Sequence, residues 1–299
     1  IFQVRPITSI KQKFSIRNLE TTISKLIFEN KKQFTNLSKK KHLVGNFTFF
    51  SDMSDWNPSE IIGNNPNQLD YSLYKFLITD DIWYKSRAIL GYHNVKSNHL
   101  MQKFGNKPYI DVRASFNSLI PKNLSKQIKK KLISYYFHKL EKFPHLHDKV
   151  EFDILFTCYD FTIDKRFVEL KNHGFTANEI DQIKSALISH TRDILNNFSA
   201  ISSECEKSLL KLLKRRDQIF SELHNSQSSY KDLLFSAEKL LIDCKNFGTL
   251  SFAIMARISF IGSILLRSLQ KKGIFGNNFY GNFINSINTP LTDIQNDVS

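Results

Sequence analysis

Helix-breaking residues are scarce in this chain of 299 residues, which has 10 glycines and 7 prolines. Scarce breakers favour long helices over a β-sandwich with many turns. Hydrophobic residues make up 41% and charged residues 23% of the sequence, which is ordinary for a globular protein with a sizeable core. We therefore expect a predominantly helical α+β fold, with a small mixed sheet in the N-terminal half and a helical bundle in the C-terminal half.

Cysteines are also few: Cys158, Cys205 and Cys244 lie far apart and show no CxxC spacing. This excludes a disulfide scaffold, and together with the lack of a signal-peptide pattern it favours the cytoplasm. No apolar run reaches the length of a membrane span. The most apolar stretch, Phe252–Leu266, contains Arg257 and is interpreted as a core helix, so no membrane partner is expected.

Motifs of several enzyme and metal-binding classes are missing. The sequence has no Gly-rich P-loop, no GxGxxG after a strand, no HExxH and no GxSxG. His145 and His147 have the spacing of metal ligands on a strand, but a polar turn is the preferred interpretation, and no metal site is expected.

The net charge of +14 favours an anionic partner. The lysine runs Lys39–Lys41 and Lys129–Lys131 have no interleaved aromatic residues, so we expect no nucleic-acid partner. A basic site for a phosphate-bearing substrate remains open.

Apolar periodicity in the N-terminal half predicts strands alternating with helices. Strands are expected at Ile1–Ile7, Leu43–Phe50, Tyr109–Phe116 and Val150–Phe156. Helices are expected at Arg17–Phe34, within Leu69–Leu90 with a break at Asp80–Asp81, and at Leu124–Leu140.

The C-terminal half shows helical spacing throughout. Thr176 and Glu179 form a capping box for a helix that ends near Phe198. Further helices are expected at about Ser202–His224, Ser229–Asn246 and Leu250–Lys272, with Gly248 and Gly273 as C-terminal stops. We expect several packed helices and no sheet over this region.

The segment SDMSDWNPSEIIG, which follows the strand predicted at Leu43–Phe50, is the most informative local feature. Pro58 favours a helix start there, with Asn57 as N-cap and Glu60 completing a capping box. Asp55 and Asn57 then lie at the tip of a strand–loop–helix corner. A capped helix start explains the segment, and capture of a carboxylate or phosphate at the helix N-terminus is the functional alternative.

A second candidate site follows from YIDVRASF at 109–116, which alternates strictly and places Asp111 and Arg113 on one face of a strand. An ion pair within the sheet explains them equally well. Alternatively, Arg113 is suited to bind a substrate carboxylate and Asp111 an ammonium, with Asn117 nearby as an amide partner.

Several blocks resemble a known family: IFQVRPI, SDMSDWNPSEIIG, YIDVRASFNSLIP, HLHDKVEFDILFTCY, CKNFGTLSFAIMARISFI and LLRSL. IFQVRPI resembles the closing strand of the ATP-grasp domain of phosphoenolpyruvate synthase. The other blocks resemble the central region of a synthase-like family of bacterial capsule gene clusters, to which L-glutamine kinase belongs.

The resemblance implies a three-part phosphotransferase. An upstream ATP-grasp domain, with ATP and Mg²⁺ bound mainly outside this chain, charges a histidine on a downstream mobile domain. That phosphohistidine then meets the amino-acid acceptor. Residues 1–10 would be the last ATP-grasp strand, 11–175 an α+β acceptor-binding region and 176–299 a helical-bundle region of the same central domain. The isolated chain would be inactive toward ATP.

The resemblance and the residues together give candidate roles. An amide nitrogen is a poor nucleophile, so a carboxylate is needed to accept its proton and cations to stabilise the transferring phosphoryl group. Asp55 and Glu151 are the catalytic candidates, and Lys149 and Arg257 are candidates to face phosphate. Two alternatives remain: a synthase-like kinase acting on another small carboxylate, and a non-catalytic helical scaffold.

Overall fold

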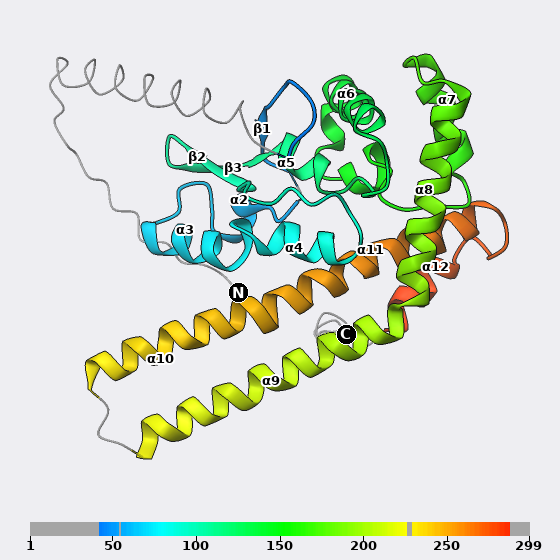
Figure 1. Ribbon diagram of the computed structural model, residues 1–299. Coiled ribbons are helices and arrows are strands. Elements are labelled where there is room, and N and C mark those ends of the chain that lie inside the picture. Colours follow the sequence, from blue (N-terminus) through cyan, green and yellow to red (C-terminus); the bar gives the residue numbers. More distant parts are fainter. Residues whose placement is uncertain (1–41, 54, 226–228, 288–299) are drawn as a thin grey trace, which may run out of the picture. The chain divides into compact units, whose positions relative to one another are not determined.

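The computed structural model describes residues 42–53, 55–225 and 229–287 (Figure 1). The strand expected at Ile1–Ile7, the helix expected at Arg17–Phe34 and the segment 1–10 lie outside these residues. The described residues form a mainly helical α+β fold, with a small sheet in the N-terminal half and helices in the C-terminal half. This confirms the predicted fold class.

The sheet has three short strands, β1 (Phe50–Ser51), β2 (Met101–Phe104) and β3 (Lys107–Asp111), in the order β1-β3-β2. Both pairings are antiparallel, with Phe50 opposite Asp111 and Met101 opposite Ile110. Gly105 and Asn106 join β2 to β3 with positive φ angles of 54° and 69°, which is the geometry of a tight hairpin turn.

The strand predicted at Tyr109–Phe116 is wrong beyond Asp111, because helix α5 (Val112–Asn117) begins at the next residue. The Asp111 side chain caps this helix by accepting a hydrogen bond from the Ala114 amide at 3.0 Å. All residues of α5 are buried, so its alternating sequence does not separate an inner from an outer face. The predicted sharing of one strand face by Asp111 and Arg113 is therefore wrong.

Four other local predictions also need correction. Leu43–Phe50 forms a strand only at Phe50, and Val150–Phe156 forms the π-helical turn η3 (Val150–Ile154) instead of a strand. Asn57 precedes the short helix α2 (Pro58–Ile61), with Pro58 at its start as predicted, but makes no side-chain cap bond, so the capping box with Glu60 is wrong. Gly248 does not end a helix, because it lies inside the π-helical segment η4 (Cys244–Thr249).

The remaining helices of the N-terminal half enclose the larger core. They are α3 (Gln68–Tyr74) with η1 (Lys75–Thr79), α4 (Ile82–Ile89), α6 (Lys126–Lys142), the short η2 (Pro144–Leu146) and α7 (Ile163–Asn172). The predicted break at Asp80–Asp81 and the helix predicted at Leu124–Leu140 are confirmed. Trp83, Ile110, Phe116 and Tyr136 are among the fully buried side chains of this core.

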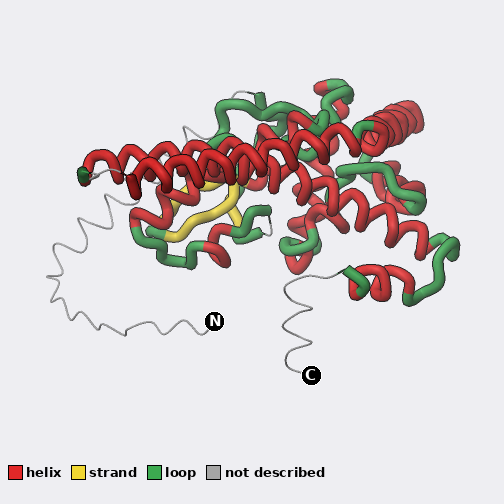
Figure 2. Tube along the Cα trace, turned by 90° about the horizontal axis from the view of Figure 1, so that it is seen from below, coloured by secondary structure: helices red, strands yellow, loops and turns green. Residues whose placement is uncertain are grey.

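The described part of the C-terminal half contains helices and no strand, as predicted. These are α8 (Ala177–Asn196), α9 (Phe198–Asn225), α10 (Tyr230–Asp243), η4, α11 (Leu250–Lys271) and α12 (Phe279–Asn285). The capping box of Thr176 and Glu179 is present at the start of α8, and Gly273 follows α11 with a φ of 76°. α9 and α10 pack as an antiparallel hairpin, and α11 packs on α4 (Figures 1 and 2).

α10, η4 and α11 form one continuous helix, Tyr230–Lys271, which is long and apolar enough to cross a membrane by length and composition alone. The stretch Phe252–Leu266, which by itself is too short for a membrane span, is thus only part of a longer apolar helix. Helices of soluble proteins can have the same length and composition; 28% of the apolar window of this helix is buried, and the helix carries the buried Arg257.

Candidate functional site

A cavity of about 400 Å³ lies where four segments meet: the loop before α2, α4, the segment ending in η3, and α11. We call it the α4–α11 cavity. Four of the predicted site residues line it: Asp55, Asn57, Glu151 and Arg257. They come from three segments that are far apart in the sequence, SDMSDWNPSEIIG, HLHDKVEFDILFTCY and CKNFGTLSFAIMARISFI, so the fold brings together three of the blocks that carry the resemblance.

Asp55 is buried and bound by Arg87 of α4. Both guanidinium Nη atoms of Arg87 donate to the carboxylate, one to each oxygen, and the Ser115 hydroxyl of α5 donates to Oδ2. Arg87 also donates to the Ser118 hydroxyl at 2.6 Å. The two side chains of the ion pair are only 5% and 2% exposed. Asp55 is thus held in one position by three hydrogen bonds.

A second ion pair joins the buried Arg257 of α11 to Glu151 of η3, whose side chain is 12% exposed. Burial by itself lowers the pKa of the Arg257 guanidinium, but the Glu151 carboxylate together with Tyr92 and Cys158 outweighs it, and the pKa is raised. Only Nη1 of Arg257 is used in this pair. Among the described residues, Nε and Nη2 have no hydrogen-bond partner although both are buried. These two atoms form one edge of the guanidinium, and such an edge binds a carboxylate through two parallel hydrogen bonds.

The corner at Trp56 and Asn57 forms another wall of the cavity. Trp56 has a φ of 55°, a left-handed conformation that is uncommon for a bulky residue. Its carbonyl accepts a hydrogen bond from the Tyr74 hydroxyl, and its ring lies 6.1 Å from that of Phe252 on α11. The Asn57 Oδ1 atom is buried and has no partner in the described part of the chain. Backbone strain and an unpartnered amide oxygen therefore occur at adjacent residues.

The charges that line the cavity are mixed. Four carboxylates and two arginines lie on its walls: Asp55, Glu60, Asp148, Glu151, Arg87 and Arg257. The apolar part comes mainly from Phe152, Phe252 and Phe260. Carboxylates and a free guanidinium edge at one small cavity are suited to a zwitterion, which needs an anion for its ammonium and a cation for its carboxylate.

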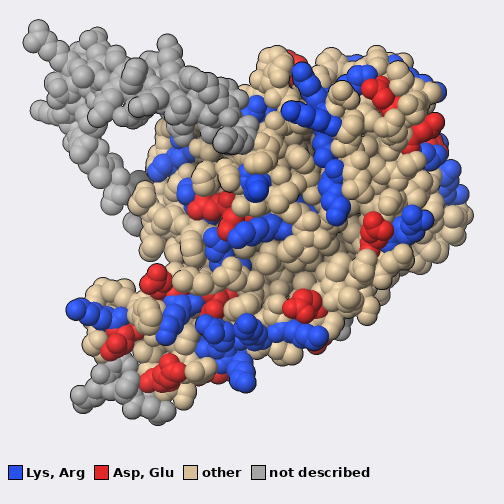
Figure 3. Space-filling view, in the orientation of Figure 1, with Lys and Arg blue, Asp and Glu red and all other residues tan. Residues whose placement is uncertain are grey.

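A basic cleft of about 740 Å³ adjoins this cavity, since Asp148 and Phe152 line both. Its cations are Lys139, Lys149, Lys165, Arg166, Arg267 and Lys271, and its anions are Asp148, Asp153 and Asp160. Lys149, a predicted phosphate-facing residue, lies here and not in the α4–α11 cavity. On the face shown in Figure 3, the other Lys and Arg side chains form separate groups interspersed with Asp and Glu. One such group lies over the α9–α10 hairpin.

The other predicted binding residues are not in the cavity lining and hold the fold together. Asp111 caps α5, and Arg113 donates to the Gly45 carbonyl at 3.3 Å. Asn117 accepts from the Val44 amide at 2.9 Å and donates to the Val44 carbonyl at 3.1 Å. The guanidinium at the Asp55 corner is that of Arg87, whereas Arg113, expected to bind a substrate carboxylate, lies outside the cavity lining.

The two histidines at 145 and 147 lie in the exposed segment around η2 (Pro144–Leu146). Within 42–53, 55–225 and 229–287, no three His, Cys, Asp or Glu side chains are grouped so that they could hold a metal ion.

Arg87, Ser115 and Ser118 were missed by the sequence analysis. Arg87 had a recognisable signal, because it lies among apolar residues of a predicted helix (IWYKSRAIL). An arginine at such a position needs a buried anion. The serines gave no such signal, because their segment was interpreted as a strand.

Comparison of the chain with protein-family models, with curated proteins and with solved structures gives no match. The family resemblance therefore depends on its sequence blocks.

Proposed function

We propose that this chain is the acceptor-binding part of an ATP-dependent phosphotransferase that uses a phosphohistidine carrier, and that the acceptor is L-glutamine. The observation that carries the proposal is the α4–α11 cavity. It combines a buried arginine edge without a partner, a buried amide oxygen without a partner, and carboxylates on the facing walls. Glutamine has a carboxylate, an amide and an ammonium, and each finds a complementary group there.

The roles follow from the contacts. The Nε–Nη2 edge of Arg257 binds the acceptor carboxylate, and Asn57 Oδ1 accepts a hydrogen bond from its side-chain amide. Asp148 and Glu60, both on the cavity wall, attract the ammonium. This assignment gives Arg257 the clamp role that the sequence suggested for Arg113.

The two carboxylates proposed as catalytic differ in their availability. The oxygens of Asp55 already accept three hydrogen bonds from Arg87 and Ser115. Glu151 has one cationic partner and is partly exposed, so it is the better acceptor for the amide proton. In the step itself the P–N bond to the carrier histidine breaks, the bond from phosphorus to the amide nitrogen forms, and the amide proton passes to Glu151.

The other parts of the machine would come from the flanking domains. An upstream ATP-grasp domain would supply ATP and Mg²⁺, and a downstream domain the phosphohistidine, in the cytoplasm. The basic cleft beside the cavity, with Lys149 in its wall, is suited to the negative charge of a phosphoryl group.

The scaffold hypothesis also has an observation in its favour. Large apolar side chains are exposed along the α9–α10 hairpin, which is typical of an interaction surface. They are Leu209, Leu210, Leu213, Phe220, Leu233, Leu234 and Phe235.

Isothermal titration calorimetry of the 299-residue chain separates these proposals. We expect L-glutamine to bind, and Arg257→Gln to weaken binding by about 2–5 kcal/mol because a buried clamp is lost. Arg267→Gln is the matched control, since Arg267 lies on the same helix but lines only the basic cleft.

Preference for L-glutamate or pyruvate over glutamine would favour a kinase of another small carboxylate. Absence of binding by all three would favour the scaffold. Circular dichroism of each variant shows whether a change in affinity comes from the site or from unfolding.

A further inference from the structure

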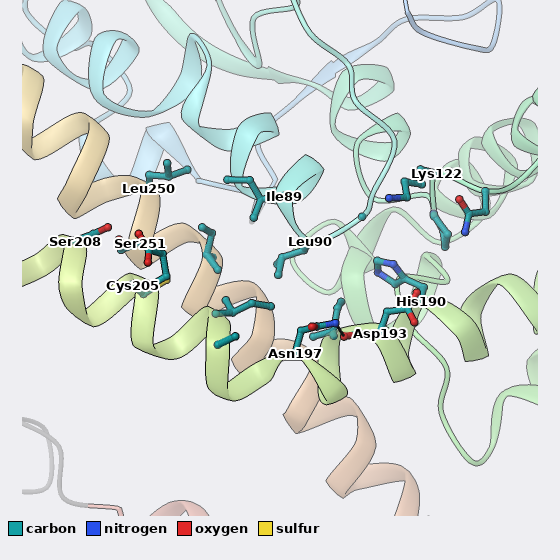
Figure 4. A pocket seen from close by; sticks show the side chains of 18 of the residues that line it. Ile89, Leu90, Lys122, His190, Asp193, Asn197, Cys205, Ser208, Leu250 and Ser251 are labelled. Carbon is teal, nitrogen blue, oxygen red and sulfur yellow. Dashed lines mark hydrogen bonds between the residues drawn. The ribbon is translucent and has the colours of Figure 1, made fainter.

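A second cavity, of about 600 Å³, lies between the C-terminal end of α4, the α8–α9 junction and α11 (Figure 4). We call it the α8–α9 cavity. It shares no lining residue with the α4–α11 cavity. Residues Leu250, Ser251 and Ile254 of α11 face it, whereas Ala253, Ala256 and Arg257 line the other cavity. α11 therefore separates two distinct cavities, and the proposed function does not use this one.

We propose that the α8–α9 cavity binds an uncharged small molecule that has an aliphatic body and a hydroxyl or amide head group placed beside His190.

The middle of the cavity is aliphatic. Branched side chains from four elements line it: Ile89, Leu90, Ile194, Ile201, Leu250 and Ile254. Figure 4 shows Ile89 and Leu90 between the Leu250–Cys205 end and the His190–Lys122 end. A flexible hydrocarbon body fits such a lining, and removing its surface from water stabilises the complex by about 25 cal/mol per Å².

His190 provides a hydrogen-bonding group at one end. Its side chain projects from α8 toward Leu90 and Lys122 (Figure 4). The ring packs edge-on against Tyr92, with centroids 4.3 Å apart, which fixes its position. His190 is only 6% exposed, and within the described residues its Nε2 atom is buried without a hydrogen-bond partner. A neutral imidazole has one donor and one acceptor, so it can bind a hydroxyl or an amide.

The surroundings of His190 favour a neutral head group over an ion. Burial lowers the pKa of His190 to about 4, so the imidazole is uncharged at neutral pH. The same loss of hydration would penalise a charged head group beside it. The charged lining residues are Lys122, Asp193 and Glu204. Lys122 and Asp193 both line this end and have opposite charges, so they select neither a carboxylate nor an ammonium.

Three eight-carbon probes test the proposal by calorimetry on the full chain: 1-octanol, octanoate and octylammonium. We expect 1-octanol to bind at least tenfold more tightly than either ion. His190→Phe keeps the ring against Tyr92 and removes both nitrogens, so it should weaken 1-octanol binding about tenfold, the effect of losing one hydrogen bond.

A cavity-filling variant tests the location. Ala200 lines the cavity and is exposed, so Ala200→Phe fills the space without disturbing the core and should abolish binding. Ala237→Phe, at an exposed position of α10 outside the cavity, should bind 1-octanol as the unchanged chain does.

The proposal is overturned if 1-octanol does not bind up to its solubility limit, or if either ion binds more tightly. It is also overturned if Ala200→Phe and Ala237→Phe bind 1-octanol equally well. Loss of glutamine binding would not affect this result, because the two cavities share no residue.

Discussion

Replacement of Arg87 by methionine would leave the Asp55 carboxylate buried without its cation. Arg87 donates two hydrogen bonds to the Asp55 carboxylate, one from each Nη atom, and a third to the Ser118 hydroxyl. Both charged side chains are almost fully buried, so water cannot replace the lost partner. Removing one member of a buried ion pair costs about 3–5 kcal/mol. We expect the free energy of unfolding of Arg87→Met to fall by that amount.

Urea denaturation followed by tryptophan fluorescence measures this change. The chain has 2 tryptophans, and both lie near the pair. The Arg87 guanidinium is 5.7 Å from the Trp83 ring, and Trp56 follows Asp55 in the sequence. Their fluorescence therefore reports on the region where the pair is broken, and circular dichroism gives the global transition.

A surface pair provides the matched control. Lys184 pairs with Asp164 at 2.7 Å, but the Asp164 side chain is 69% exposed. Lys184→Met should change stability by no more than about 1 kcal/mol. The double replacement Asp55→Leu with Arg87→Met removes both charges and should recover much of the loss, because two apolar side chains need no partner. If Arg87→Met costs no more than Lys184→Met, the reasoning about a buried and mutually dependent pair is refuted.

Two further predictions concern stability. Burial lowers the pKa of His190 from 6.5 to about 4, so below pH 6.5 the unfolded chain binds a proton that the folded chain does not. The free energy of unfolding should therefore fall by about 3 kcal/mol as the pH drops from 6.5 to 4. Denaturation curves measured across this range should show a smaller loss in His190→Phe. The control His145→Phe, at an exposed site, should show the full loss. Gly45 has a φ of 93°, and a Cβ there would lie 2.8 Å from Ile133 Cγ2, so Gly45→Ala should lower the unfolding free energy by at least about 1–2 kcal/mol. Gly276→Ala meets no atom within 4 Å and should change it by less than about 0.5 kcal/mol; equal effects of the two replacements would contradict the steric argument.

The features that the sequence predicted correctly are determined by local interactions. The capping box of Thr176 and Glu179 and the start of α10 at Ser229 involve residues three positions apart. The apolar spacing of α8 to α11 is likewise repeated over many turns, so its period is unambiguous. Such signals depend little on the rest of the chain.

The errors at 109–116 and 150–156 have a common cause. Both segments are short and fully or largely buried, and over five to eight residues an alternating pattern fits a strand or a buried helical turn equally well. At Asp111 the alternating pattern predicted a strand, whereas the preference of aspartate for the N-cap position favoured a helix start, and the structure has the helix start. The pairing of Arg87 with Asp55, and of Arg257 with Glu151, was not predictable because it depends on how α4 and α11 pack.

The energetic cost of the α4–α11 cavity is itself an argument for ligand binding. Buried ion pairs seldom stabilise a fold more than apolar side chains of the same volume would, and this cavity contains one such pair, Arg87–Asp55, and a second in which Arg257 is buried and Glu151 largely so. Arg257 and Asn57 also bury polar atoms without partners in the described structure, at about 1–3 kcal/mol for each such group. A helical scaffold gains nothing from these groups, since Leu or Met would fill the same space at lower cost. An acceptor that supplies a carboxylate to Arg257 and an amide to Asn57 would satisfy both, so the groups that destabilise the free protein are the ones that the proposed function assigns to the acceptor.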